Sequence, residues 1–94
     1  MHSIQSLEEL RRYVQETLCE RHALDPKQFP MVESLLTRAG RPCGLYFCQH
    51  GPRLMKAHAV WDGERDVLAF YDSSGTRFHK VQLSQGPDPK RLAA

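Results

Sequence analysis

The sequence has no long hydrophobic run. Its apolar stretches are only a few residues long, whereas a helix that crosses a bilayer needs about 20 mostly apolar residues. It also shows no basic segment followed by an apolar one at its start, where residues 1–4 lead directly into an amphipathic pattern. We therefore predict a cytoplasmic protein without a membrane partner.

The sequence has little excess of either charge and few cysteines. Thirteen basic and eleven acidic residues leave a net charge of +2, which neither requires nor excludes a nucleic-acid partner. The three cysteines, Cys19, Cys43 and Cys48, cannot all pair within one chain. Cys43 and Cys48 are an odd number of residues apart, so on one regular strand they would point to opposite faces. We expect buried free thiols in a reducing compartment.

No spacing of residues ties the sequence to a particular reaction. A metal site needs three or four converging ligands, and neither Cys19 with His22 nor Cys48 with His50 has a third ligand at a suitable spacing. A Cys–His nucleophile pair is disfavoured because Cys48 and His58 are predicted on opposite faces of the sheet, with no orienting acid. The sequence thus predicts a protein that is not an enzyme and has no metal and no cofactor.

The 94 residues suffice for one domain, and 40% hydrophobic with 26% charged residues is typical of a folded globule. Residues 1–83 are predicted to form this single domain. Residues 84–94 contain two prolines and show no periodicity, so we predict a flexible C-terminal tail there.

An amphipathic helix is predicted at the N-terminus. Ser6 and Glu9 have the spacing of a capping box, in which the Ser6 side chain accepts from the Glu9 amide. Apolar residues then recur at helical spacing, at Leu7, Leu10, Val14 and Leu18. The helix should run from about residue 7 to about residue 21.

Four runs rich in β-branched and aromatic residues follow, at roughly 44–49, 54–61, 66–71 and 76–83. Loops as short as those between them connect antiparallel neighbours, so the runs predict a meander. Residues 31–38 fit either one face of a helix or an alternating strand. We favour a strand because residues 39–42 then make a hairpin loop. The predicted class is α+β, with the N-terminal helix packed on a four- to five-stranded antiparallel meander sheet that could curl into a partial barrel.

The turns suggest how the strands align, although an error of one residue would turn a strand over. A bulged third turn is predicted, with Gly75 at positive φ. The predicted cross-strand pairs are Cys48–Met55, Leu45–His58, Val60–Val67, His58–Ala69, Ala69–His79 and Tyr71–Arg77.

These pairs divide the side chains between two faces. The face under the helix would carry Tyr46, Cys48, Met55, Ala57, Ala59, Trp61, Leu68, Phe70 and Phe78. The other face would carry Leu45, Phe47, Leu54, Lys56, His58, Val60, Val67, Ala69, Tyr71, Arg77, His79, Val81 and Leu83. This second face is too apolar to be left in water. A closed barrel, a second copy of the chain, or another partner or small molecule could cover it.

The second face also holds the candidate ligand-binding residues. His58 and His79 fall in one row, with Lys56, Tyr71 and Arg77 nearby, and such a basic and partly aromatic surface suits an anionic ligand. We predict a non-enzymatic binding or protein-interaction module that acts through the sheet face not covered by the helix. Its partner would be a second copy, another protein or an anionic small molecule.

The alternative is a single-stranded nucleic-acid-binding module. Arginines at the turns and aromatic residues on the strands are compatible with base stacking. Against it, the arginines lie at opposite ends of the predicted sheet, and Asp62, Glu64 and Asp66 place negative charge beside two of them.

Overall fold

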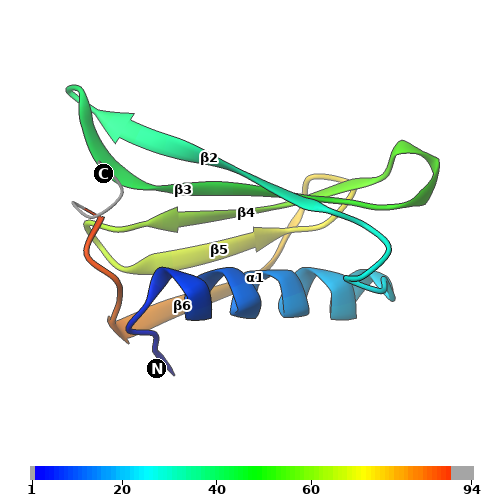
Figure 1. The fold of residues 1–94 in the computed structure, drawn as a ribbon, viewed down its shortest axis with the longest axis horizontal. Coiled ribbons are helices and arrows are strands. Elements are labelled where there is room, and N and C mark those ends of the chain that lie inside the picture. The colour runs from blue at the N-terminus through cyan, green and yellow to red at the C-terminus, as the bar shows by residue number, and fades with distance from the viewer. Residues whose placement is uncertain (1, 90–94) are drawn as a thin grey trace.

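One helix followed by a five-stranded antiparallel meander makes up most of the chain (Figure 1). The structure is a computed structural model that describes residues 2–89. Its elements are β1 (His2–Ser3), α1 (Leu7–His22), β2 (Met31–Arg38), β3 (Arg41–His50), the short 3-10 turn η1 (Pro52–Leu54), β4 (Lys56–Asp62), β5 (Val67–Tyr71) and β6 (Arg77–Gln85). The predicted α+β class and meander are confirmed, and residues 31–38 form a strand.

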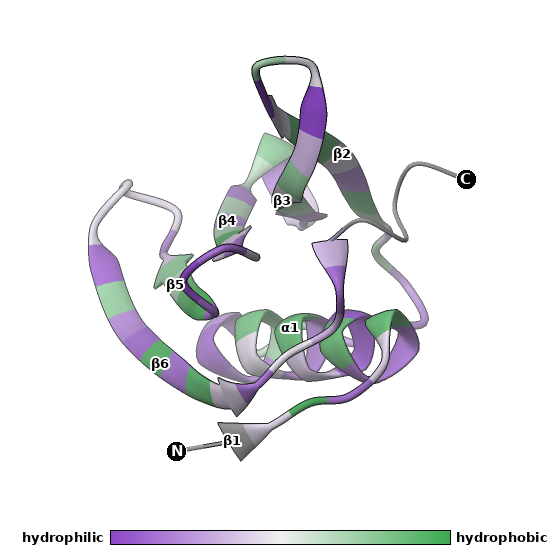
Figure 2. Ribbon diagram, turned by 90° about the vertical axis from the view of Figure 1, so that its left-hand side faces the viewer, coloured by the Kyte–Doolittle hydropathy of each residue, from purple (hydrophilic) through white to green (hydrophobic). Residues whose placement is uncertain are grey.

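The sheet is open and does not close into a barrel. Its strand order is β1-β6-β5-β4-β3-β2, so β1 and β2 lie at its two ends, and the two-residue β1 is parallel to β6. Figure 2 shows that the sheet curves around α1, which lies inside the curve. Among residues 2–89, no helix is both long and apolar enough to span a membrane.

Helix α1 begins and ends where local chemistry favours it. Ser6 is extended at the N-cap and accepts a hydrogen bond from the Glu9 amide (3.1 Å), as predicted. At the other end Ala23 takes a left-handed φ of 54°, and Leu24 N–H donates to the Cys19 carbonyl (2.8 Å). The observed helix is one residue longer than the predicted one.

The core lies between α1 and the concave face of the sheet. Leu10, Val14 and Leu18 are fully buried, as are Phe47 and Trp61 on the strands beneath them. Fully burying one such side chain stabilises the fold by about 1.5–3 kcal/mol. This packing holds the helix on one side of the sheet, so the other side of the sheet is not covered by it.

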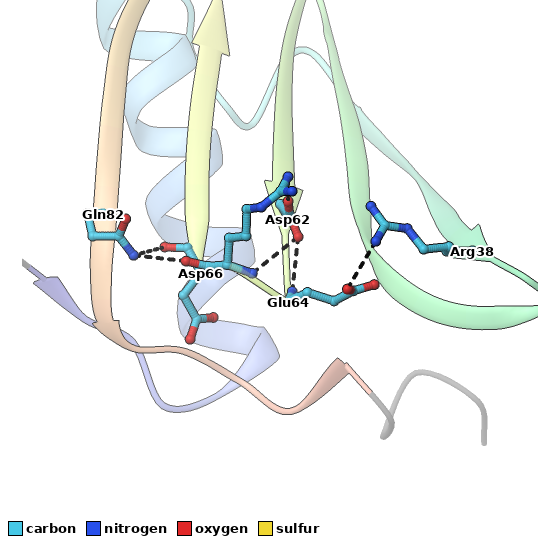
Figure 3. Close-up of polar contacts among 6 residues, drawn as sticks. Arg38, Asp62, Glu64, Asp66 and Gln82 are labelled. Carbon is cyan, nitrogen blue, oxygen red and sulfur yellow. Dashed lines mark hydrogen bonds and ion pairs between the residues drawn. The ribbon is translucent and has the colours of Figure 1, made fainter.

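Two turns keep the strand ends in place. Ala39 and Gly40 both have positive φ (52° and 77°), which gives the two-residue turn that matches the twist of β2 and β3. At the β4–β5 turn, the Asp62 carboxylate accepts from the amides of Glu64 (3.0 Å) and Arg65 (3.3 Å). Figure 3 shows how the Gln82 side chain reaches from β6 to carbonyl oxygens of the same turn.

Part of the predicted C-terminal tail lies against the sheet. Strand β6 continues to Gln85, whose carbonyl accepts from the Ile4 amide (2.9 Å), and Pro87 is buried. Residues 90–94 of the predicted tail lie outside the described residues.

The predicted alignment of β3 with β4 is wrong. Cys48 pairs with His58 rather than with Met55, and Leu45 pairs with Trp61 rather than with His58. The connecting loop contains the turn η1, and its closing hydrogen bond runs from Gly51 N–H to the Met55 carbonyl (2.9 Å), so the loop is longer than a two-residue turn.

The shift is an odd number of residues, so it turns β3 over. Leu45 and Phe47 therefore point toward α1 and are buried. Tyr46 and Cys48 lie on the opposite face, against the prediction.

The next hairpin is displaced by an even number of residues, which leaves its faces as predicted. Val60 pairs with Ala69 rather than Val67, and His58 pairs with Tyr71 rather than Ala69. The sides predicted for these residues are therefore unaffected.

The last hairpin is bulged as predicted, with Gly75 at a φ of 88°, and the Tyr71–Arg77 pair is confirmed. The bulge leaves Phe78 unpaired, so His79 lies opposite Phe70 rather than Ala69. This one extra residue turns the rest of β6 over. The residues that move from the predicted second face to the helix side are His79, Val81 and Leu83.

Candidate binding face on the sheet

The sheet face that points away from α1 is called the open face here. The strand pairing places its side chains in rows that cross β2 to β6. One row is Val32, Cys48, His58, Tyr71 and Arg77. The next is Ser34, Tyr46, Val60, Ala69 and Lys80, and the third is Leu36, Gly44, Asp62, Val67 and Gln82. His50 and Lys56 lie opposite each other beyond the first row.

Four of the five predicted ligand-binding residues lie together on the open face. His58 is paired with Tyr71, and Tyr71 with Arg77, while Lys56 is two residues from His58 on the same side of β4. His79 is separated from them by the sheet. It lines a shallow groove of about 460 Å³ between α1 and β6, with Thr17, Glu20, Arg21 and Phe78. The predicted row that joins His58 to His79 is therefore wrong.

A tyrosine that the predicted alignment placed elsewhere contacts the central histidine. The Tyr46 hydroxyl lies 2.5 Å from Nδ1 of His58, and the two rings are stacked with their centroids 5.5 Å apart. Tyr46 comes from β3, so only the correct β3–β4 alignment could have revealed it. Two further residues of the open face, Lys80 and His50, were missed for similar reasons. The position of Lys80 depends on the bulge in β6, and that of His50 depends on the loop between β3 and β4.

Both partners of this contact have shifted pKa values. Burial lowers the pKa of His58, and the neighbouring positive charges of Lys56 and His50 lower it further. Burial raises the pKa of Tyr46, as does the neighbouring Cys48. A neutral His58 can accept the Tyr46 O–H at Nδ1, with its own proton on Nε2, or it can donate Nδ1–H to the Tyr46 oxygen in the other tautomer.

The charge on the open face is predominantly positive. Its basic side chains are His50, Lys56, His58, Arg77 and Lys80. Among the described strand residues of this face, Asp62 is the only carboxylate. That carboxylate already accepts the turn amides and lies 3.4 Å from the Arg65 guanidinium. The cationic side chains of the face thus have little local compensation.

The observed open face is less apolar than the predicted one. Leu45, Phe47, Val81 and Leu83 all lie in the core instead. The apolar residues that remain on the open face are smaller or partly covered, and they include Val60, Val67 and Ala69. A face of this composition can stand in contact with water, so its apolar area does not by itself require a barrel or a second copy to cover it.

Cys48 and His58 share the open face as a cross-strand pair, which corrects the prediction that they lie on opposite faces. The Cys48 thiol is free and half-buried. Nδ1 of His58 is taken by Tyr46, and Asp62 is four residues away along β4, roughly 13 Å, so no carboxylate on the described part of this face orients the imidazole. Within residues 2–89, no group of three His, Cys, Asp or Glu side chains is placed to hold a metal ion.

Comparisons with known proteins assign no family. No protein-family model matches the sequence, and neither a curated protein nor a solved structure shows significant similarity to it.

Proposed function

We propose that this protein is a non-enzymatic binding module that holds an anionic partner on its open face. The observation that carries the proposal is the charge of this face, where Lys56, Arg77 and Lys80 are cationic beside the histidines His50 and His58, whereas the described strands place a single carboxylate there, Asp62, which already accepts from the amides of its own turn. Phosphate and carboxylate groups are the natural partners of arginine and lysine, and histidine adds to such a site when it is protonated.

The arrangement favours a ligand with more than one negative group. Arg77 lies two strand spacings, roughly 9–10 Å, from His58 in the same row, and Lys56 is two residues from His58 along β4. The flexible side chains of Lys56 and Arg77 can both reach a ligand above Tyr71, which lies between their strands on β5. The Arg53–Leu54 segment adjoins the same end of the face, and Leu54 is 92% exposed.

The double charge reversal Lys56→Glu/Arg77→Glu tests this proposal. We expect it to weaken the binding of inorganic tripolyphosphate at least tenfold, or about 1.4 kcal/mol, because two attractive charges become repulsive. Isothermal titration calorimetry at low salt measures the affinity, and amide chemical shifts map the site to Lys56, His58 and Tyr71. The control is Arg12→Glu, at an exposed arginine on α1, which is compared with Lys56→Glu alone because both change the net charge equally; the Arg12 variant should change the affinity less than twofold.

Two results would reject the proposal. One is equal weakening by the Arg12 variant, which would indicate attraction to overall charge only. The other is a set of shifts confined to the groove between α1 and β6.

Binding should also strengthen as the pH falls from 7.5 to 5.5. The pKa of His58 is lowered, so in the free protein this imidazole is neutral at pH 7 and gains its proton below the usual value of about 6.5. A bound anion favours the charged form, so the affinity rises as His58 becomes protonated. The charged and titratable neighbours that face it are Tyr46, Cys48 and His50 on β3, Lys56 on its own strand, Tyr71 on β5 and Arg77 beyond Tyr71 on β6.

The comparison of His58→Gln with His79→Gln assigns this pH dependence, because protonation of tripolyphosphate itself affects both variants equally. His58→Gln should reduce the pH dependence, whereas His79→Gln, on the other side of the sheet, should leave it unchanged. The same pH dependence in His58→Gln as in the native protein would contradict a role for His58.

A single-stranded nucleic acid is the second candidate, and the stacked rings of Tyr46 and His58 are the observation that favours it. With Tyr71 beside them, these rings could receive unstacked bases, each worth about 1–3 kcal/mol. Trp61 is fully buried on the helix side, so its fluorescence would not report such stacking. Tighter binding of an oligothymidylate than of polyphosphate with equal charge, lost in Tyr46→Ala, would favour this candidate. Equal affinities would favour simple anion binding.

A further inference from the structure

Strand β2 forms one end of the sheet, and no strand in the described part of the chain pairs with its outer edge. It is eight residues long and contains no proline. Val32 is 50% exposed and Leu35 is 47% exposed. Natural proteins usually protect long edge strands of this kind, because unpaired backbone groups readily pair with another strand.

The backbone groups that face outward can be identified from the pairing with β3. The Pro30 carbonyl accepts from the His50 amide (3.0 Å), so even-numbered residues of this segment direct their N–H and C=O groups toward β3. The alternation of an antiparallel strand then directs the groups of the odd-numbered residues outward. These residues are Met31, Glu33, Leu35 and Thr37.

We propose that β2 pairs antiparallel with β2 of a second copy of this chain, with Ser34 on the two-fold axis. In this alignment Met31 lies opposite Thr37 of the other copy, and Glu33 lies opposite Leu35. All four outward-facing residues then have partners on both copies. Moving the axis to Glu33 or to Leu35 leaves one of them unpaired, and an axis at Glu33 also places two like charges opposite each other.

The side chains of β2 fit this alignment. On the open face, Val32 lies opposite Leu36 of the second copy and Leu36 opposite its Val32, which gives two apolar pairs around the central Ser34. On the helix side, the Glu33 carboxylate remains bound to the Arg11 guanidinium of its own α1 (2.6 and 2.9 Å).

The charge at the far end of β2 is also compensated within each copy. The Arg38 guanidinium lies 3.3 Å from the Glu64 carboxylate (Figure 3). A second copy would thus meet no uncompensated charge along the strand.

The dimer would join the two open faces. A two-fold axis that relates paired edge strands is perpendicular to the sheet, so both open faces lie on the same side of one continuous sheet and both helices on the other. The enlarged basic surface would bind one long anionic partner, and this part of the proposal rests on the proposed function. The dimer itself does not, and its tests are made without a ligand.

A cysteine at the axis tests the alignment. Ser34 would face its own copy in a non-hydrogen-bonded pair with Cα atoms about 4.5 Å apart, which a disulfide can bridge. Under mild oxidation we expect most of Ser34→Cys to become a covalent dimer. The control Thr37→Cys lies on the same exposed edge but roughly 20 Å from its copy, and it should remain at the level that the three native thiols give. Equal cross-linking of both variants, or of neither, would overturn the alignment.

A proline in the edge tests the dimer without cysteine. Leu35→Pro removes an N–H that faces outward and leaves the bonds between β2 and β3 intact. Sedimentation equilibrium at 100 µM should show a dimer for the native protein and at least tenfold weaker association for Leu35→Pro. If that variant fails to fold, Val32→Lys serves the same purpose, since it places a charge against Leu36 of the second copy. A native monomer, or a dimer that survives the folded variant used, would overturn the proposal.

Discussion

Replacing Phe47 by alanine is expected to lower the free energy of unfolding by about 3–5 kcal/mol. Phe47 is fully buried and lies in the core cluster with Ala59 as its partner on β4. The small alanines beside it cannot expand to fill the space, so a cavity would remain. Because domains of this size are stabilised by only about 5–15 kcal/mol, urea unfolding should be followed at low temperature.

Tyr46→Ala is the matched control for this prediction. The Tyr46 ring lies half-exposed on the open face and stacks on His58, so its loss should cost only about 1 kcal/mol. A larger loss of stability for Tyr46→Ala than for Phe47→Ala would show that β3 is turned over, with the opposite set of side chains in the core.

The order of the elements could be predicted from the sequence because local signals specify it. Ser6 and the apolar spacing after it identify α1, and the short turns identify an antiparallel meander. The side of the sheet that each residue faces also depends on the geometry of the loops, which could not be predicted from the sequence. In the β3–β4 loop, Arg53 and Leu54 have positive φ values of 59° and 63°. Glycine or asparagine usually occupies such positions, so the sequence gives no sign of this conformation.

The candidate site was partly recovered despite this error. Four of the candidate residues lie on β4, β5 and the start of β6, namely Lys56, His58, Tyr71 and Arg77. There the predicted strand alignment was either correct or displaced by an even number of residues, which leaves the faces unchanged. His79 lies after the bulge and was therefore assigned to the wrong face. Tyr46 contacts His58, but it was assigned to the wrong face together with the rest of β3.

The corrected faces change the reason for proposing a binding role. The sequence suggested an uncovered apolar face, but four of its large apolar residues lie in the core. What remains is a basic face with adjoining aromatic rings and little negative charge. The argument for a partner thus shifts from the hydrophobic effect to electrostatics, and it predicts binding that weakens with added salt.

Gln49 is the residue outside the apolar core whose replacement should matter most. It is fully buried on the helix side of β3, and its Nε2 lies within 3.0–3.3 Å of the carbonyl oxygens of Phe29, Pro30 and His50. Its Oε1 accepts from the Gln15 side chain of α1 (3.4 Å). A single amide thus joins the helix, the segment before β2 and the end of β3.

Gln49→Met keeps most of the side-chain volume and removes the donor, so we expect it to lower the free energy of unfolding by about 2–4 kcal/mol, because the Phe29 and His50 carbonyls lose this donor while the Pro30 carbonyl keeps the His50 amide. Gln49→Glu should cost more at pH 7, because a carboxylate would then face those carbonyl oxygens. Its pKa would be raised above the unfolded value of about 4.3, so its stability should recover as the pH falls toward that value. Urea unfolding at pH 7 and pH 5 compares the two variants, and a Glu variant that is no less stable than the Met variant at pH 7 would contradict the donor role of Gln49.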